Sequence, residues 1–358
     1  ISLLIGESLY GQNPNIITLS SPDSGNKNYV AQTKIQMTPG YKYTAGPNAM
    51  RAYIEQATSY GPLYSSASFD GATINTGLPV GSVNGEMTIS EYGAMNYFIP
   101  IKLPPGTNDL VPNLGISYNS QGGNDILGMG WSLTGLSSIS VTPTTWYQDG
   151  SVDEVKLDGT DKLALDGKRL HLISGTYGAN NAVYYTENES YNKITSYSSA
   201  GVQWFNVETK DGMTLEYGKT LDSRVKDQNG DAFILWKLNK ISDAYGNYIQ
   251  FVYRNHNNES RIDKIFYTGN ESQNLTPYNT IEFEYQTRTD LNSAYVKGTE
   301  FKMNTLLSSI RISTENGELV KTYEFNYGEN RYSYLRMIKE IGSDGTKLNP
   351  TIFKYGEK

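Results

Sequence analysis

The feature of this sequence that most constrains its fold is a series of Asn-Gly and Asp-Gly dipeptides between short apolar segments. Both positions of such a pair accept positive φ angles, so the pair is typical of a two-residue turn between antiparallel strands. The dipeptides are Asn84-Gly85, Asp149-Gly150, Asp158-Gly159, Asp166-Gly167, Asp211-Gly212, Asn229-Gly230, Asn316-Gly317 and Asp344-Gly345. Turns at this density leave little room for helices, and they predict long antiparallel hairpins in series.

The segments between these turns alternate apolar and polar residues, which places one set of side chains on a buried face. The clearest examples are residues 97–103, 114–118, 249–253, 281–285, 307–312 and 323–327. A loose repeat of strand, glycine turn and strand begins at Trp236, Arg261 and Leu335. Such units bury a face only by stacking on their neighbours. We therefore predict an all-β chain in which a series of long antiparallel hairpins forms a sheet that curls.

Composition excludes several classes of function. Lys and Arg number 30 against 37 Asp and Glu, so no excess of basic residues is present to bind nucleic acid or an anionic membrane surface. A chain without cysteine has no disulfide, no thiol nucleophile and no cysteine zinc site, and its two histidines, His171 and His256, cannot build a histidine-rich metal site. No stretch reaches the roughly 18 apolar residues of a membrane-spanning helix. We expect no nucleic-acid partner and no membrane insertion.

The first 70 residues differ from the rest in composition. Residues 1–12 open with the apolar run Ile1–Gly6 and resemble the end of a secretory signal peptide, with an ordinary first strand as the alternative. Residues 13–69 predict a small N-terminal β module and a linker at residues 60–68, although residues 49–57 could instead form one helix. Residues 70–358 predict one large β domain. The chain is expected to be secreted or displayed at the cell surface.

The most informative stretch is residues 97–143, which reads as strand, Pro-Gly turn, strand and then a glycine-rich loop around one tryptophan. The glycines suggest positive φ angles or close backbone approach, and Trp131 is predicted to be the buried anchor. The motif residues that we single out are Pro104, Pro105, Gly106, Tyr118, Asn119, Ser120, Asn124, Gly128, Gly130, Trp131, Gly135 and Leu136.

This stretch closely resembles the N-terminal domain of the Salmonella virulence plasmid protein B (SpvB) family, which also opens the B component of insecticidal toxin complexes and is allied to Rhs and YD-repeat proteins. The resemblance covers about residues 75–355. It implies a β domain, running into YD-repeat-like strands, that begins a large hollow β-shell. In relatives, that shell encloses a toxic C-terminal segment. The implied partners are the remainder of the polypeptide and an export or delivery machinery.

Several residue patterns could carry chemistry, and each has a structural alternative. Residues 130–135 have the outline of a nucleophile elbow, but the second glycine comes one residue too late. Glu282-Phe-Glu284 matches the last element of an ADP-ribosyltransferase site in the wrong order, because it precedes Arg311, and a strand with a charged outer face explains it. Asp227–Asp231 could be a calcium loop or a hairpin turn. Asp161 and Asp166 could be a glycosidase pair or turn residues.

We therefore predict a non-catalytic, shell-forming segment of an exported Rhs/SpvB-type toxin or surface protein, with no catalytic, cofactor or metal site. The alternative is a cell-surface adhesin or carbohydrate-binding module on the same scaffold, since exposed Tyr and Asn can stack on and hydrogen-bond to sugars. We also expect a free sheet edge near the last predicted strand, at Phe353 and Tyr355, through which an open or curved chain self-associates.

Overall fold

The chain divides into two compact units in the computed structural model: residues Ile1–Phe69 with Tyr355–Lys358, and residues Asp70–Lys354. The structure describes residues 16–20, 23–24, 28–31, 34–37, 42–44, 51–54, 75–79, 81, 83–256, 258–329 and 331–355. The predicted signal-peptide remnant and the predicted linker lie outside these residues.

The described part of the first unit consists of short strands in parallel pairs. They are β1 (Ile16–Leu19), β2 (Asp23–Ser24), β3 (Asn28–Ala31), β4 (Lys34–Met37), β5 (Tyr43–Thr44) and β6 (Arg51–Ile54). β1 pairs with β4, β2 with β5 and β3 with β6, so three strands in succession lie beside the next three. The helix alternative for residues 49–57 is wrong, because Arg51–Ile54 form a strand that pairs along its whole length with β3.

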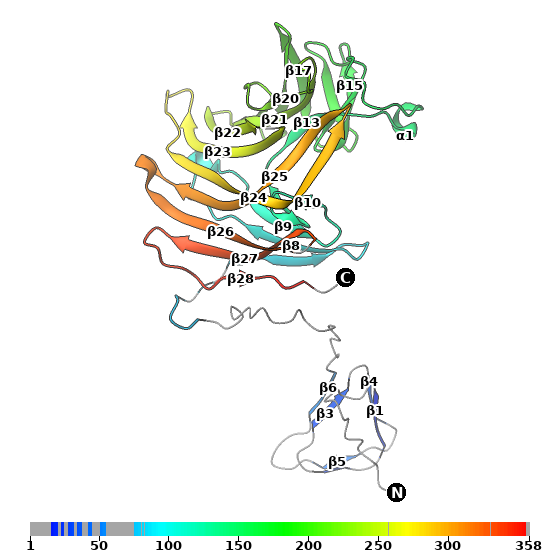
Figure 1. Ribbon diagram of the computed structural model, residues 1–358, viewed down its shortest axis with the longest axis vertical. Coiled ribbons are helices and arrows are strands. Elements are labelled where there is room, and N and C mark those ends of the chain that lie inside the picture. Colours follow the sequence, from blue (N-terminus) through cyan, green and yellow to red (C-terminus); the bar gives the residue numbers. More distant parts are fainter. Residues whose placement is uncertain are drawn as a thin grey trace. The chain divides into compact units, whose positions relative to one another are not determined.

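The second unit contains a ring of antiparallel strands, coloured green in Figure 1. Its members are β13 (Ser138–Thr142), β14 (Lys162–Leu165), β15 (Lys168–Ser174), β16 (Val183–Thr186), β17 (Lys193–Ser199), β18 (Val202–Glu208), β19 (Thr214–Tyr217) and β21 (Phe233–Ser242). Each pairs with the next, and β13 returns to pair with β21 at Ile139 and Trp236. β20 (Arg224–Lys226) also pairs with β21. This pairing closes the first part of the sheet on itself.

From β21 the same sheet continues as a long, curved run of antiparallel strands, yellow to red in Figure 1. These are β22 (Asn247–His256), β23 (Glu259–Asn270), β24 (Asn279–Val296), β25 (Thr299–Ser313), β26 (Leu319–Glu329), β27 (Ser333–Gly342) and β28 (Thr351–Ile352). The all-β prediction is confirmed, and so is the predicted arrangement of long hairpins in a curled sheet. We call β22–β28 the long sheet.

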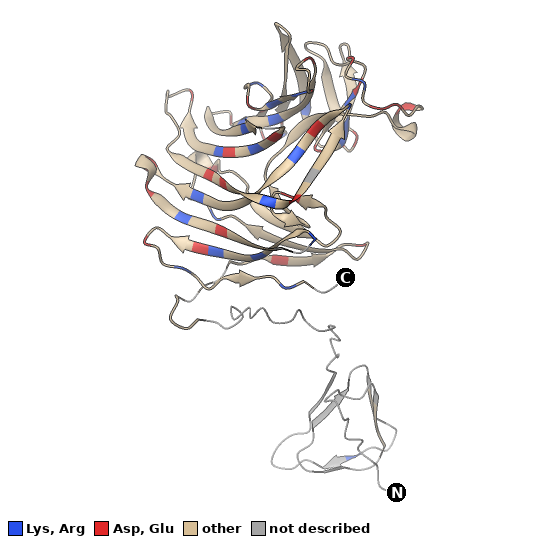
Figure 2. Ribbon diagram, in the orientation of Figure 1, with Lys and Arg blue, Asp and Glu red and all other residues tan. Residues whose placement is uncertain are grey.

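The two faces of the long sheet differ as the alternating pattern predicts. Ile265, Ile281 and Ile310 are fully buried on one face. The other face carries acidic and basic residues, and Figure 2 marks their positions along β23–β27. Many of these pair across strands, as Lys264 does with Glu282 and Lys321 with Glu340. The long sheet therefore has one apolar face, which needs a cover, and one solvated face.

A four-stranded antiparallel sheet, cyan in Figure 1, covers part of that apolar face. Its order is β12 (Trp131–Thr134), β9 (Gly115–Asn119), β8 (Met95–Pro100) and β7 (Glu86–Ile89). We call it the small sheet. A two-stranded pair, β10 (Asn124–Asp125) and β11 (Gly128–Met129), joins β9 to β12. Ile99, Ile116 and Trp131 of the small sheet belong to the same buried core as the inner face of the long sheet.

Most of the predicted turns lie between consecutive strands. The pairs at Asp166, Asp211, Asn229, Asn316 and Asp344 each join neighbouring strands, and their glycines all have positive φ. Asp149-Gly150 instead ends the short helix α1 (Trp146–Asp149), and Asn84-Gly85 precedes β7 without a positive φ at the glycine. The other helical segments in the described residues are single 3₁₀ turns, η2 (Thr107–Asp109) and η3 (Glu315–Gly317). None of the described helices is long and apolar enough to span a membrane.

Candidate functional site

The residues that the sequence singles out gather where the small sheet and its glycine-rich loop meet the long sheet. Trp131 is 2% exposed, as predicted for a buried anchor. Its ring lies 5.1 Å from that of Tyr118 on β9 and 4.6 Å from that of Phe353, which follows β28. Aromatic rings at these distances contribute beyond the area that they bury. Trp131 therefore joins the small sheet to the last strand of the long one.

The Pro-Pro-Gly segment contacts the other end of the long sheet. The hydroxyl of Tyr267 on β23 donates a hydrogen bond to the carbonyl of Pro104 at 3.1 Å. The side-chain amide of Asn279 on β24 donates to the carbonyl of Pro105 at 3.4 Å. Gly106 follows and precedes the η2 turn. The carbonyl groups of Pro104 and Pro105, which belong to no strand, thus accept hydrogen bonds from side chains of the long sheet.

Asn119, Ser120 and Gly130 hold the end of the small sheet together. The amide N–H of Asn119 donates to the carbonyl of Gly130 at 2.9 Å, and its side chain donates to Asn96 Oδ1 at 2.9 Å. The hydroxyl oxygen of Ser120 accepts from the N–H of Met95 at 3.0 Å. These bonds are internal to the small sheet and its loop, and they set where the loop begins.

The glycine-rich loop lies directly against the long sheet. The N–H of Leu307 on β25 donates to the carbonyl of Ile126 at 2.8 Å. Gly128 has a φ of +86°, and a Cβ atom there would lie 2.5 Å from the carbonyl oxygen of Ser333 on β27. Gly135 has a φ of +93°, and a Cβ there would lie 2.1 Å from the carbonyl oxygen of Asn113. The close packing of backbone on backbone therefore requires glycine at both positions. Leu136 packs against the common core.

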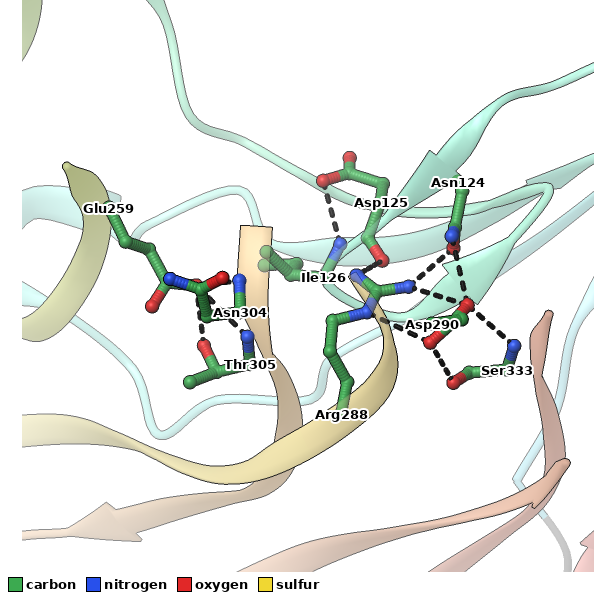
Figure 3. A network of polar contacts seen from close by, with 9 residues as sticks. All are labelled: Asn124, Asp125, Ile126, Glu259, Arg288, Asp290, Asn304, Thr305 and Ser333. Atoms are coloured by element: carbon green, nitrogen blue, oxygen red, sulfur yellow. Dashed lines mark hydrogen bonds and ion pairs between the residues drawn. The ribbon is translucent and has the colours of Figure 1, made fainter. Parts of the chain in front are cut away.

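A buried arginine connects the loop to the long sheet through several hydrogen bonds (Figure 3). The ladder between β24 and β25 is interrupted between Thr287 and Asn292, and Arg288 lies in this interruption with its side chain 0% exposed. Its guanidinium forms two parallel bonds of 3.1 Å to the carboxylate of Asp290. It also donates to the carbonyl of Asp125 at 3.1 Å and to Asn124 Oδ1 at 2.6 Å.

The carboxylate of Asp290 is equally well satisfied. It accepts from the side-chain amide of Asn124 at 2.9 Å and from the N–H of Ser333 at 2.7 Å, and the hydroxyl of Ser333 donates to its other oxygen. One ion pair thus connects the loop, β24 and β27. We call Asn124, Arg288, Asp290 and Ser333 the arginine cluster.

Electrostatics explains why this pair is stable in the interior. Burial by itself raises the pKa of the Asp290 carboxyl, but hydrogen bonds from Arg288, Ser333 and Asn124 outweigh it and hold that pKa far below its usual range. A buried ion pair is tolerated when hydrogen bonds satisfy its remaining donors and acceptors. Removing one partner leaves the other charge buried and uncompensated, which is strongly destabilising. Arg288 and Asp290 therefore depend on each other, and together they hold the glycine-rich loop against β24 and β27.

A second carboxylate fixes the neighbouring part of the sheet (Figure 3). Glu259, at the start of β23, accepts from the backbone N–H groups of Asn304 and Thr305, each at 3.1 Å. It also accepts from the hydroxyl of Thr305 at 2.7 Å and pairs with Arg261 at 3.0 Å. The Arg288–Asp290 pair and the carboxylate of Glu259 thus both bind backbone groups or side chains within the fold.

The acidic residues that suggested chemistry have structural partners. Glu282 pairs with Lys264, and Glu284 accepts from Ser309 at 2.7 Å, both on the solvated face of the long sheet. Asp161 accepts from the N–H groups of Lys156 and Leu157 at 2.7 and 2.6 Å, and Asp166 from Ser137 and Ser138 at 2.7 and 2.9 Å.

The remaining candidates lie in turns or strands. Asp227 Oδ1 accepts from the N–H groups of Asp231 and Ala232 at 2.7 and 2.9 Å, within a hairpin turn. His171 stacks on Tyr185 with ring centroids 5.3 Å apart, and His256 lies at the end of β22. Within the described residues, no group of acidic or histidine side chains is placed to hold a metal ion.

Sequence reasoning missed Arg288, Asp290 and a buried lysine, Lys237 on β21. All three are charged residues in strands, and a charge at such a position predicts a solvated face. The available signal for Arg288 and Asp290 was the loss of alternation after Tyr285, where five polar residues follow one another at 286–290. No comparable signal marks Lys237.

Comparison with known proteins settles the family. A family model described as Salmonella virulence plasmid 65kDa B protein matches residues 89–274, more than half of the chain. The chain belongs to the SpvB family. The match spans β8, β9 and β12 of the small sheet, Asn124 of the arginine cluster, the whole ring and the first two strands of the long sheet. No curated protein matches the sequence.

Solved structures share the fold. The N-terminal domain of the effector protein SpvB from Salmonella typhimurium strain LT2 is 18% identical, with a TM-score of 0.58 over 68% of this chain and 98% of that one. The TcdB2-TccC3 structure is 16% identical, with a TM-score of 0.61 over 77% of this chain. The Tc holotoxin pore of Photorhabdus luminescens is 17% identical, with a TM-score of 0.61 over 78% of this chain. This chain spans only 17% and 16% of those two toxin chains.

Proposed function

We propose that this chain is a non-catalytic section of a β-shell in a larger exported protein, and that the shell encloses or presents a C-terminal effector of the same polypeptide. The observation that carries the proposal is the long sheet, which leaves the ring at β21 and curls with its apolar face turned towards the small sheet. Strands added beyond β28 would extend that curl. The chain's match to a small fraction of much longer toxin chains supports the same interpretation.

The polar sites fit a structural role. Arg288 and Asp290 direct their charges to groups of the glycine-rich loop and the long sheet, and Glu259 binds β25 within the long sheet, so all three stabilise the fold. The partners that we propose are the remaining strands and the effector of the same polypeptide, together with an export or delivery machinery. We also propose that the protein is located outside the cytoplasm of the cell that produces it.

Protease protection of the product of the complete open reading frame tests the proposal. We expect the segment beyond the shell to resist trypsin in the intact protein and to be degraded in the Arg288→Ala variant, which weakens the contact between the sheets. Arg254→Ala is the matched control, because Arg254 pairs with Asp263 on the solvated face with its side chain 59% exposed. Degradation of the downstream segment at one rate in all three proteins would contradict enclosure.

A further inference from the structure

Among the described residues, Lys237 is unexpected because its side chain is buried, whereas a lysine in a strand usually lies on the solvated face. The residue is 8% exposed, and it lies on the face of β21 opposite to Trp236. Its Nζ donates to the hydroxyl of Ser260 and lies 4.6 Å from the ring centroid of Tyr253. Among the described residues, no carboxylate lies within ion-pair distance of it.

Lys237 also faces a pocket of about 240 Å³ at the junction of the ring, the long sheet and the glycine-rich loop. Its apolar walls include Ile126, Leu133, Leu136 and Ile262. A dry cavity of about 150 Å³ is enough to hold benzene. The pocket therefore has room for an organic molecule of a few non-hydrogen atoms beside the amine.

The other charged groups around the pocket are already engaged. Arg261 pairs with Glu259 and lies 4.4 Å from the ring centroid of Tyr285, and Asp166 accepts from Ser137 and Ser138. Asp125 accepts from the N–H of Ile126 at 2.7 Å, and burial raises the pKa of its carboxyl. Asp222, which accepts from the N–H of Tyr253, favours the charged form of Lys237 from outside the pocket.

Burial determines the state of the amine. It lowers the pKa of Lys237 to about 7, against the opposing effect of Asp222. A large fraction of the amine is therefore unprotonated near neutral pH, whereas an ordinary lysine with a pKa of about 10.4 has well under 1% in that form. Desolvated lysines of this kind act as nucleophiles towards carbonyl groups.

We propose that Lys237 is a covalent modification site that binds small uncharged aldehydes or ketones in this pocket as an imine. The lone pair of Nζ adds to the carbonyl carbon while the C–O π bond breaks, and a proton passes from nitrogen to that oxygen to give a carbinolamine. The hydroxyl group then leaves with the second amine proton as water, and a C=N bond forms. Asp125 and Asp166 disfavour a carbonyl compound that carries a carboxylate.

Reductive labelling of the native chain tests the site. Propanal with sodium cyanoborohydride at pH 7 converts each imine into a stable propylamine, and peptide mass spectrometry measures the rate at every lysine. Lys240 is the internal control, because it lies on the same strand and 5.2 Å from a tyrosine ring centroid, but is paired with Glu271. We expect Lys237 to react at least about ten-fold faster than Lys240, because burial lowers the pKa of the Lys237 amine to about 7.

Two further measurements make the result decisive. In guanidinium chloride the two lysines should react at equal rates, and glyoxylate should reduce the preference for Lys237 that propanal shows in the folded chain. Equal rates in the folded chain, or a preference that persists after unfolding, would overturn the proposal. A stronger preference with glyoxylate would overturn the assignment to uncharged carbonyl compounds.

Discussion

At the scale of single residues, two buried basic side chains of the same sheet, on β21 and β24, have opposite surroundings. The guanidinium of Arg288 has a carboxylate, a carbonyl and an amide oxygen within hydrogen-bonding distance. The amine of Lys237 has one hydroxyl and one aromatic ring. Because an uncompensated buried charge is far more costly than a neutral polar group, the first residue stays charged and the second loses its proton readily.

Trp131→Ala should lower the free energy of unfolding by about 3 to 5 kcal/mol, the usual cost of deleting a large buried aromatic side chain. The residue is 2% exposed and contacts Tyr118 and Phe353, so its loss leaves a cavity between the sheets. Urea unfolding followed by far-ultraviolet circular dichroism measures the change. Trp146→Ala, at a position 74% exposed on α1, is the matched control. Equal stability of the two variants would contradict the role of Trp131 as the anchor.

Lys237→Met should stabilise the fold at pH 6 to 7 by roughly 1 to 4 kcal/mol, the range seen when buried ionic groups are replaced by apolar ones. The pKa of Lys237 is about 7 in the folded chain, against 10.5 for an ordinary lysine, so the unfolded chain binds more protons between these values. The stability of the wild type must therefore rise with pH across that window.

The advantage of the methionine variant should accordingly be largest at or below pH 7 and should fall as the pH approaches 10. Urea unfolding at pH 6.5, 8 and 9.5 measures it. Lys240→Met, which removes a lysine whose side chain is 22% exposed and paired with Glu271, is the control. An advantage that does not change with pH would show that the amine is not the source of the effect.

At the scale of elements, the hairpins could be predicted from sequence and the contacts between sheets could not. Asp166-Gly167 and its counterparts specify their turns locally, because only a few residue types accept the φ angles of a tight hairpin. The prediction of a hairpin turn at Asp149-Gly150 was wrong, because a glycine with positive φ is also common at the end of a helix, and Gly150 ends α1. The pairing of Ile139 with Trp236 joins strands far apart in the chain, and alternation says nothing about which edges meet. The arginine cluster was missed because a charged residue in a strand predicts a solvated face, whereas Arg288 is buried.

Gly128→Ala tests how closely the glycine-rich loop packs against β27. The substitution combines a positive φ with a Cβ only 2.5 Å from the carbonyl oxygen of Ser333, so it should cost more than the roughly 1 to 2 kcal/mol of a left-handed alanine. Gly93→Ala is the matched control, because Gly93 has a φ of +78° and open space around its Cβ position. The difference in thermal stability between the two variants measures the cost of the close contact with Ser333, because both glycines have a positive φ. Equal losses would mean that the loop can move away from β27.

At the scale of the whole second unit, a closed ring and an open sheet share one strand, β21. The ring leaves its own strands no free edge, whereas the open part has an edge at β28 in the described residues. Asn75 and Val83 contact side chains at that edge through their backbone groups. Asn75 and Asn349 exchange two hydrogen bonds, and the hydroxyl of Thr351 donates to the carbonyl of Val83 at 3.3 Å. No backbone ladder joins the two segments within the residues that the structure describes.

That edge should make the chain self-associate in a concentration-dependent way, which sedimentation velocity measures. Phe353 donates its N–H to Arg336 on β27, so the backbone groups of Ile352 point away from β27, towards the edge. Ile352→Pro removes the outward donor and leaves the bonds to β27 intact, and we expect it to weaken association. Met87→Pro makes the same change on the edge strand β7, where Met87 is 64% exposed, and should have little effect.

If the Met87 variant dissociates and the Ile352 variant does not, the edge that causes association belongs to the small sheet. A monomeric wild type would mean that the side-chain contacts of Asn349 and Thr351 already protect β28.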